Sequence, residues 1–106
     1  MIYELRTYVA AENKAELLHE RFKNGTLRIF GRHNIKVVGF WTEHSNPNKL
    51  VYLCKFETKE EQEKAWDNFA SDSEWKKMKQ ESELDGPITA SMDRTLLKPV
   101  DYTPQP

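Results

Sequence analysis

Two runs of β-branched and aromatic side chains form the most apolar part of the sequence. Residues 35–43 (IKVVGFWTE) and 49–57 (KLVYLCKFE) are rich in side chains that suit a pleated surface. The polar residues between them, 44–48 (HSNPN), are typical of a turn that no strand would keep. The pattern predicts an antiparallel hairpin at the centre of a sheet.

Two further segments alternate between apolar and polar positions. Residues 1–9 and 88–97 follow a period of two, which predicts one strand at each end of the chain. In the first strand, three chemically reactive side chains share one face: Glu4, Arg6 and Tyr8.

Helical spacing fills the interval between the first strand and the hairpin. Asn13 is a favoured N-cap, and Glu16 is placed to complete a capping box. Asn24-Gly25 predicts a stop or a kink. Residues 26–33 then predict a second helical piece.

A second helical region follows the hairpin. Thr58 is the predicted N-cap, with Glu61 in the capping-box position. Residues 71–74 (SDSE) interrupt the helix with a new set of N-cap residues. The apolar face predicted before this interruption consists of Gln62, Ala65, Trp66 and Phe69.

The predicted order is β-α-β-β-α-β, the ferredoxin-like pattern of an α+β domain. Both helical regions then cover one face of a four-stranded antiparallel sheet. The strands carry too many apolar side chains to leave the opposite face in water, so we expect a homodimer that packs sheet against sheet. One domain should span residues 1–106, with residues 98–106 as an extended, proline-containing C-terminal arm.

The composition excludes several classes of protein. With 16 basic and 17 acidic residues, the formal net charge is -1, and no basic stripe indicates nucleic-acid binding. The single cysteine, Cys54, rules out an internal disulfide. No apolar run is long enough to span a bilayer, and residues 2–6 (IYELR) do not resemble a signal peptide. We therefore expect a cytoplasmic protein.

Four short motifs resemble the NIPSNAP family. They are residues 3–8 (YELRTY), 39–41 (GFW), 72–75 (DSEW) and 96–99 (LLKP), in the family's order and approximate spacing between about residues 2 and 104. The resemblance implies a dimeric α+β barrel, a superfamily that also holds small monooxygenases and haem-degrading enzymes.

The strongest candidate site is the polar face of the first strand. If Tyr3 and Leu5 face the helices, Glu4, Arg6 and Tyr8 face the barrel interior, joined by Tyr52 from the hairpin. There the guanidinium could hold an anionic or carbonyl group, the carboxylate could act as a base and the phenol could orient the ligand. The alternative is a Glu4–Arg6 ion pair that only satisfies two buried charges.

Two other side chains are candidates for the site. His33 lies where a helix enters the second strand, so it is either a proton carrier at the barrel mouth or a histidine that ends a helix. Trp41 either lines a pocket or plugs the end of the barrel. The spacing of His19, His33 and His44 fits no common metal site, and we expect neither metal nor cofactor.

Three functions follow from these observations. The first is a homodimer that binds a small organic molecule in the barrel interior, with Arg6 as its anchor. The second is a non-enzymatic protein-interaction module, which predicts a filled interior and an exposed apolar patch. The third, a small monooxygenase-like enzyme, rests on the resemblance alone.

Overall fold

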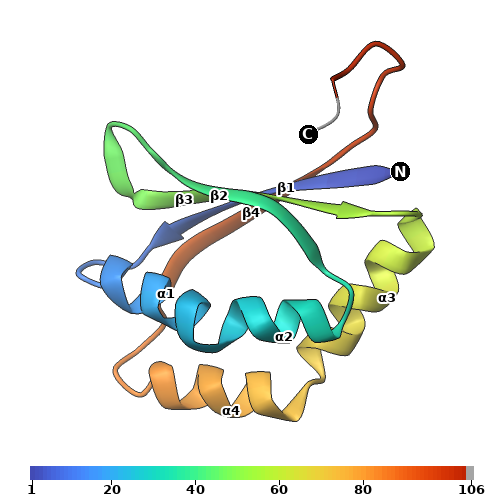
Figure 1. The fold of residues 1–106 in the computed structure, drawn as a ribbon. Coiled ribbons are helices and arrows are strands. Elements are labelled where there is room, and N and C mark those ends of the chain that lie inside the picture. The colour runs from blue at the N-terminus through green and yellow to red at the C-terminus, as the bar shows by residue number, and fades with distance from the viewer. Residues whose placement is uncertain (105–106) are drawn as a thin grey trace.

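The chain folds as a four-stranded antiparallel sheet with all its helices on one face (Figure 1). The computed structural model describes residues 1–104. Its elements, in order, are β1 (Ile2–Ala10), α1 (Ala15–Arg21), the π-helical turn η1 (Phe22–Thr26), α2 (Leu27–Arg32), β2 (Lys36–Glu43), β3 (Asn46–Phe56), α3 (Lys59–Ala70), α4 (Ser73–Ser82) and β4 (Thr89–Leu97). The predicted ferredoxin-like order is confirmed.

The hairpin supplies only one of the two central strands. The sheet order is β2-β3-β1-β4, so β3 is central and β2 forms an edge. The polar residues 44–48 are also not all loop, because Asn46 already pairs with Glu43 and begins β3. The backbone N–H of Asn48 donates to the side chain of Asn46 over 3.1 Å. This local turn and the shift in register beside it admit Pro47 into the strand.

The first helical region departs from its predicted boundaries. Asn13 has a φ of 62° and is not the N-cap; α1 begins after Lys14, without a side-chain cap. Gly25 does not end the helix, because α1, η1 and α2 follow one another without interruption. A Cβ atom at Gly25 would collide with Sδ of Met78 on α4. Gly25 therefore permits a close approach between η1 and α4.

The second helical region begins as predicted. The backbone N–H of Glu61 donates to Oγ1 of Thr58 over 3.1 Å, at the start of α3. Asp72 caps α4, since its Oδ1 accepts from the backbone N–H groups of Glu74 (2.9 Å) and Trp75 (3.0 Å). Both caps satisfy donors that a helix N-terminus otherwise leaves unpaired.

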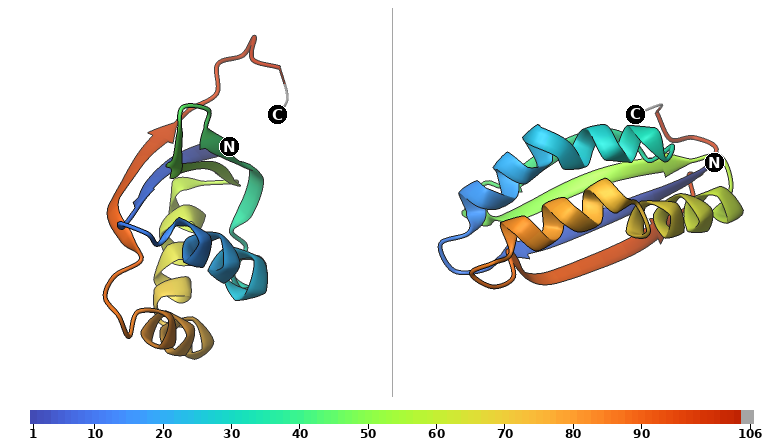
Figure 2. Two further views of the ribbon diagram at one scale, coloured as in Figure 1. Left: turned by 90° about the vertical axis from the view of Figure 1, so that its left-hand side faces the viewer. Right: turned by 90° about the horizontal axis from the view of Figure 1, so that it is seen from below.

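Aromatic rings fill the space between the sheet and the helices. Tyr52 is fully buried, and Phe40 from the neighbouring strand stacks on it with ring centroids 4.9 Å apart. Phe22 and Phe30 reach the same ring from the helices, at 5.6 and 6.1 Å. α1 and α2 form one row of the helical layer, and α3 and α4 form the row beside it on the same face of the sheet (Figure 2).

In the orientation considered from the sequence, Tyr3 and Leu5 of β1 face the helices, and the structure shows the opposite orientation. Glu4, Arg6 and Tyr8 face the helices, together with Tyr52. Tyr3 and Leu5 lie on the other face, where the chain leaves them half-buried. The physical reason is that α3 carries polar partners for Glu4, so its carboxylate is satisfied on the helix side.

The face of the sheet opposite the helices is called the open face below. Its apolar side chains are Tyr3, Leu5, Val9, Trp41, Val51, Leu53 and Leu97, and the pairing register places Thr7, Lys49, Lys55, Asp93 and Thr95 on the same face. Trp41 is 54% exposed and packs over Gly39, where a Cβ would lie only 2.8 Å from the indole.

The C-terminal segment leaves the sheet on the side of the open face (Figure 1). The sequence predicted a fully extended arm, but the N–H of Thr103 donates to the carbonyl of Val100 and closes a turn. Residues 105–106 lie outside the described part of the chain. No helix within residues 1–104 has the length and apolar character needed to cross a membrane.

Candidate functional site

Glu4 is a buried carboxylate surrounded by hydrogen-bond donors. Its side chain is fully enclosed by the protein. Oε1 accepts from Nε2 of Gln62 (2.8 Å) and Nε1 of Trp66 (2.7 Å), both on α3, and Oε2 accepts from Nη1 of Arg6 (2.7 Å). These contacts favour the interpretation of Glu4 and Arg6 as a buried ion pair, because such a pair is stable only when further hydrogen bonds satisfy it. Glu4 is not placed to act as a base toward a ligand.

Arg6 is held on three sides. Nε donates to the Tyr8 hydroxyl over 3.2 Å, and Cζ lies 4.0 Å from the ring centroid of Trp66. The second terminal nitrogen, Nη2, makes no hydrogen bond to any other group in residues 1–104. Burial by itself would lower the pKa of Arg6, but Tyr8, Tyr52 and Glu4 together raise it above the ordinary value. Arg6 is therefore a fixed cation with one free donor group.

Tyr8 and Tyr52 continue the network into the core. Their hydroxyl oxygens are 2.7 Å apart and share a hydrogen bond. Burial raises the pKa of Tyr52 well above its usual value, so this phenol stays neutral. The structure brings Glu4, Arg6, Tyr8 and Tyr52 together on the helix side of the sheet, and not on the face expected to line the barrel interior.

A cavity of about 640 Å³ lies beside this network, between β4, α3, α4 and the end of α1. Arg6, Tyr8 and Trp66 form part of its wall. Phe69 and Trp75 extend the wall as a row of aromatic rings, with Phe69 5.9 Å from Trp66 and 4.7 Å from Trp75. The cavity therefore combines apolar surfaces with a buried cation, as small-molecule sites do.

Arg21 is a second cation in the cavity wall that the sequence analysis missed. Its side chain is only 8% exposed, and Nη1 donates to Oε2 of Glu83 (2.9 Å) and to Oγ of Ser82 (3.1 Å). Cζ lies 4.9 Å from the ring centroid of Trp75. Within the described chain, Nε is buried without a hydrogen-bond partner. No local signal indicated this role, because α4 brings the partners of Arg21 from about sixty residues away.

Neither the Cys54 thiol nor a metal-ligand cluster adds a reactive group among the described residues. Burial, with a smaller contribution from Glu4, raises the pKa of Cys54 to about 12, so its thiol stays protonated. Residues 1–104 contain no group of three or more His, Cys, Asp or Glu side chains that could hold a metal ion.

The sequence matches the NIPSNAP family model over residues 3–104. The chain belongs to the NIPSNAP family. A comparison with curated protein sequences found no match.

Solved structures of other family members share the fold of this NIPSNAP chain. An uncharacterized NIPSNAP domain protein from Burkholderia xenovorans has a TM-score of 0.84 at 19% identity, over 99% of this chain and 100% of that chain. A NIPSNAP family protein from Agrobacterium tumefaciens reaches 0.85 at 15% identity, over 97% and 96%. A putative antibiotic biosynthesis monooxygenase from Nitrosomonas europaea is more distant, with 0.66 at 9% identity over 94% and 99%. At these identities the likeness establishes the fold, and function must come from the site.

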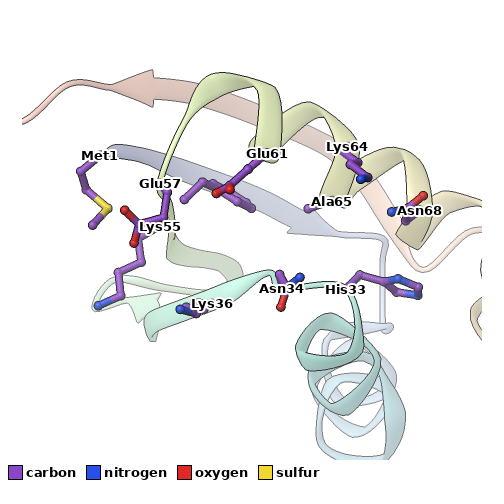
Figure 3. A pocket seen from close by; sticks show the side chains of 11 residues that line it. Met1, His33, Asn34, Lys36, Lys55, Glu57, Glu61, Lys64, Ala65 and Asn68 are labelled. Carbon is purple, nitrogen blue, oxygen red and sulfur yellow. The ribbon is translucent and has the colours of Figure 1, made fainter.

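The remaining two predicted site residues lie away from the cavity of this NIPSNAP chain. His33 borders a separate groove of about 380 Å³ between α3 and the start of β2 (Figure 3). Its Nε2 is 2.7 Å from Oδ2 of Asp72, which supports the interpretation as a histidine at a helix end. Trp41 belongs to the open face and does not line the cavity. It lines a separate groove of about 300 Å³ at the β2 edge, together with residues such as His19 and Leu27.

Charged side chains link α2 to the start of α4. Oδ2 of Asp72 also accepts from Nη1 of Arg32 (2.9 Å), and Glu74 pairs with Arg28 and Arg32. The contact with His33, followed by the backbone N–H of Trp75, lowers the pKa of Asp72 well below its usual range. Hydrogen bonds from Arg28 and then Arg32 lower the pKa of Glu74 to about 2.

These shifts predict a loss of stability in acid. A carboxylate with a depressed folded-state pKa stabilises the fold fully above its unfolded pKa, about 4, and this contribution disappears as the pH falls through the folded value. We expect the melting temperature of the protein to fall between about pH 5 and pH 2. The double variant Asp72→Asn/Glu74→Gln should show a flatter profile, because Asn still caps α4 but neither side chain titrates.

The matched control is Glu12→Gln/Glu20→Gln, which removes two exposed carboxylates elsewhere. It should keep the wild-type slope of melting temperature against pH. Identical profiles for the two double variants would contradict the importance of this cluster.

Proposed function

We propose that this NIPSNAP chain binds a small, flat organic molecule in the cavity between the sheet and the helices, and that it does so as a homodimer. The observation that carries the proposal is the cavity itself, about 640 Å³ in volume and walled by Arg6 and an aromatic row. This volume lies in the range of about 300 to 1,000 Å³ that is typical of ligand pockets.

The chemistry of the wall favours a ligand with an oxygen acceptor. Arg6 lines the cavity, and its Nη2 is unpaired within residues 1–104, while Nη1 and Nε donate to Glu4 and Tyr8. A guanidinium that is already fixed in place loses little side-chain entropy when it binds a carbonyl or carboxylate. Both carboxylate oxygens of Glu4 already accept hydrogen bonds, the Tyr52 phenol is neutral and the Cys54 thiol is protonated. The site is therefore suited to binding more than to acid–base catalysis by these groups.

The open face supports the dimer. Tyr3, Leu5 and Leu53 are half-buried in one protomer, and Trp41 is 54% exposed. An apolar face of this kind gains free energy when a second copy covers it, roughly 25 cal/mol per Å² before the costs of association. The face lies opposite the helices, so the dimer would leave the cavity of each protomer intact.

The cavity also favours ligand binding over the alternative function, a protein-interaction module. That alternative needs no cavity within the protomer, whereas a cavity of about 640 Å³ lies beside Arg6 on the helix side of the sheet. The exposed C-terminal segment, with Tyr102 84% exposed, is the feature that would serve such a module. The two functions use different surfaces, so one probe can distinguish them.

A neutral fluorescent probe tests whether the cavity accepts a flat molecule. The chain has three tryptophans, and the Trp41→Phe variant keeps only the two in the cavity wall, Trp66 and Trp75. We expect N-phenyl-1-naphthylamine to bind this variant with energy transfer from the remaining indoles. Adding Ala70→Phe, which places a ring at the cavity wall, should weaken binding about tenfold.

The control is Ala90→Phe in the same background. Ala90 is an exposed alanine like Ala70, but it does not line the cavity. Equal effects of the two substitutions, or no energy transfer at all, would contradict a ligand site in the cavity.

A further inference from the structure

We propose, on the basis of the proposed function, that the ligand is a monocarboxylic acid with a flat apolar body and that Arg21 anchors its carboxylate. Arg21 lines the same cavity as Arg6 and is 8% exposed. Unlike Arg6, it lies outside the motifs that point to the family.

The protein leaves one edge of the Arg21 guanidinium without hydrogen bonds. Both hydrogen bonds of Arg21 leave from Nη1, to Ser82 and Glu83. Nε is buried without a partner, and Nη2 makes no hydrogen bond within residues 1–104. Nε and Nη2 form the side-on edge of a guanidinium, where two parallel donors match the two oxygens of one carboxylate. Nη2 is the donor that a ligand oxygen can reach directly, and a second contact at the buried Nε requires the Arg21 side chain to shift toward the cavity.

The charge balance of the cavity counts against a ligand with more than one negative charge. Four basic and three acidic side chains line the cavity, and the buried Glu4 beside Arg6 makes the balance even. Arg6 and Arg21 each already hold one protein carboxylate. Free donor groups, more than excess positive charge, are therefore available to a ligand. A dianion such as a phosphate ester would meet uncompensated repulsion from the acidic residues.

The aromatic row favours a flat apolar body. Trp66 and Trp75 flank Phe69, and each indole also carries a guanidinium on its face, Arg6 at 4.0 Å and Arg21 at 4.9 Å. A planar ligand can pack along these rings while its acid group reaches Arg21. Arg6 lies at the other end of the row, where Nη2 is available to a second oxygen on the ligand.

The test compares 1-naphthoate with 1-naphthamide, a neutral molecule of nearly the same shape, by calorimetric titration of the chain of residues 1–106. We expect the wild type to bind 1-naphthoate at least about tenfold more tightly than 1-naphthamide. This difference in affinity is typical of one charge-assisted hydrogen bond. Arg21→Lys keeps the charge and its pairing with Glu83 but removes the side-on edge, so it should lose this preference. Lys23→Gln, an exposed cation two residues away, should keep it.

A second variant addresses the possibility that Arg21→Lys weakens the packing of α1 on α4. Glu83→Gln leaves Arg21 in place and removes a competing carboxylate, so its affinity for 1-naphthoate should equal or exceed that of the wild type. Reduced affinity in this folded variant would overturn the assignment of Arg21.

The outcomes separate this inference from the proposed function. Equal affinities for the two naphthalenes, or an unchanged preference in folded Arg21→Lys, would overturn the inference and leave the cavity site standing. The same holds if the neutral dye binds in the cavity and 1-naphthoate does not. If neither the dye nor either naphthalene binds, both the inference and the proposed function are wrong.

Discussion

Replacing Arg6 with methionine is expected to lower the free energy of unfolding by about 3 kcal/mol. The substitution leaves the fully buried Glu4 carboxylate without its cation, although Gln62 and Trp66 still donate to it. A buried charge that loses its partner is far more costly than a lost surface ion pair, and a domain of this size is stable by only about 5 to 15 kcal/mol. Urea denaturation followed by circular dichroism measures the effect.

Arg94 provides a matched control for this substitution. Arg94 on β4 is the register partner of Arg6 on β1, but its side chain is exposed. Arg94→Met should therefore change the free energy of unfolding by no more than about 0.5 kcal/mol. The double variant Glu4→Gln/Arg6→Met should recover part of the loss, because it removes the isolated charge. Equal effects of the two single arginine substitutions would contradict the buried ion pair.

Placing glutamate at Leu53 is expected to raise the dissociation constant of the homodimer by about 100-fold or more. Leu53 lies in the middle of the open face, opposite Leu5 on β1 and Gly39 on β2. In a single protomer the new carboxylate would reach water, so the fold should survive. In the dimer, each copy would bury an unpaired charge against its partner. Sedimentation velocity over a concentration series measures the shift.

Leu17→Glu makes the same chemical change on α1, at a leucine that is 42% exposed and away from the open face. It should leave the association unchanged. A stable dimer interface should hold at concentrations of roughly tens of micromolar. If the wild-type protein sediments as a folded monomer there, the proposed dimer is contradicted.

Much of the fold could be predicted because its signals are local. Period-two alternation located β1 and β4, and Thr58 and the set of N-cap residues at 71–74 located the starts of α3 and α4. Each of these signals depends on residues within a few positions of one another. Asn13 misled the prediction for the same reason, since a residue suited to an N-cap is also suited to the left-handed turn it adopts.

The orientation of the site could not be predicted in this way. Alternation along β1 shows which side chains share a face, and it grouped Glu4 with Arg6 and Tyr8 correctly. It does not show which face meets the helices, because both faces of β1 carry apolar side chains. The orientation depends on Gln62 and Trp66, which meet Glu4 from 58 and 62 positions away.

The most direct test of the ligand site is a proton–nitrogen correlation spectrum of the protein titrated with 1-naphthoate. Each tryptophan gives one indole signal, so three signals report on the molecule. Trp66 and Trp75 line the cavity, and Trp41 lies on the open face. We expect the signals of Trp66 and Trp75 to shift with a common saturation curve while that of Trp41 stays in place. Shifts confined to Trp41, or no shifts at saturating ligand, would contradict a binding site between the sheet and the helices.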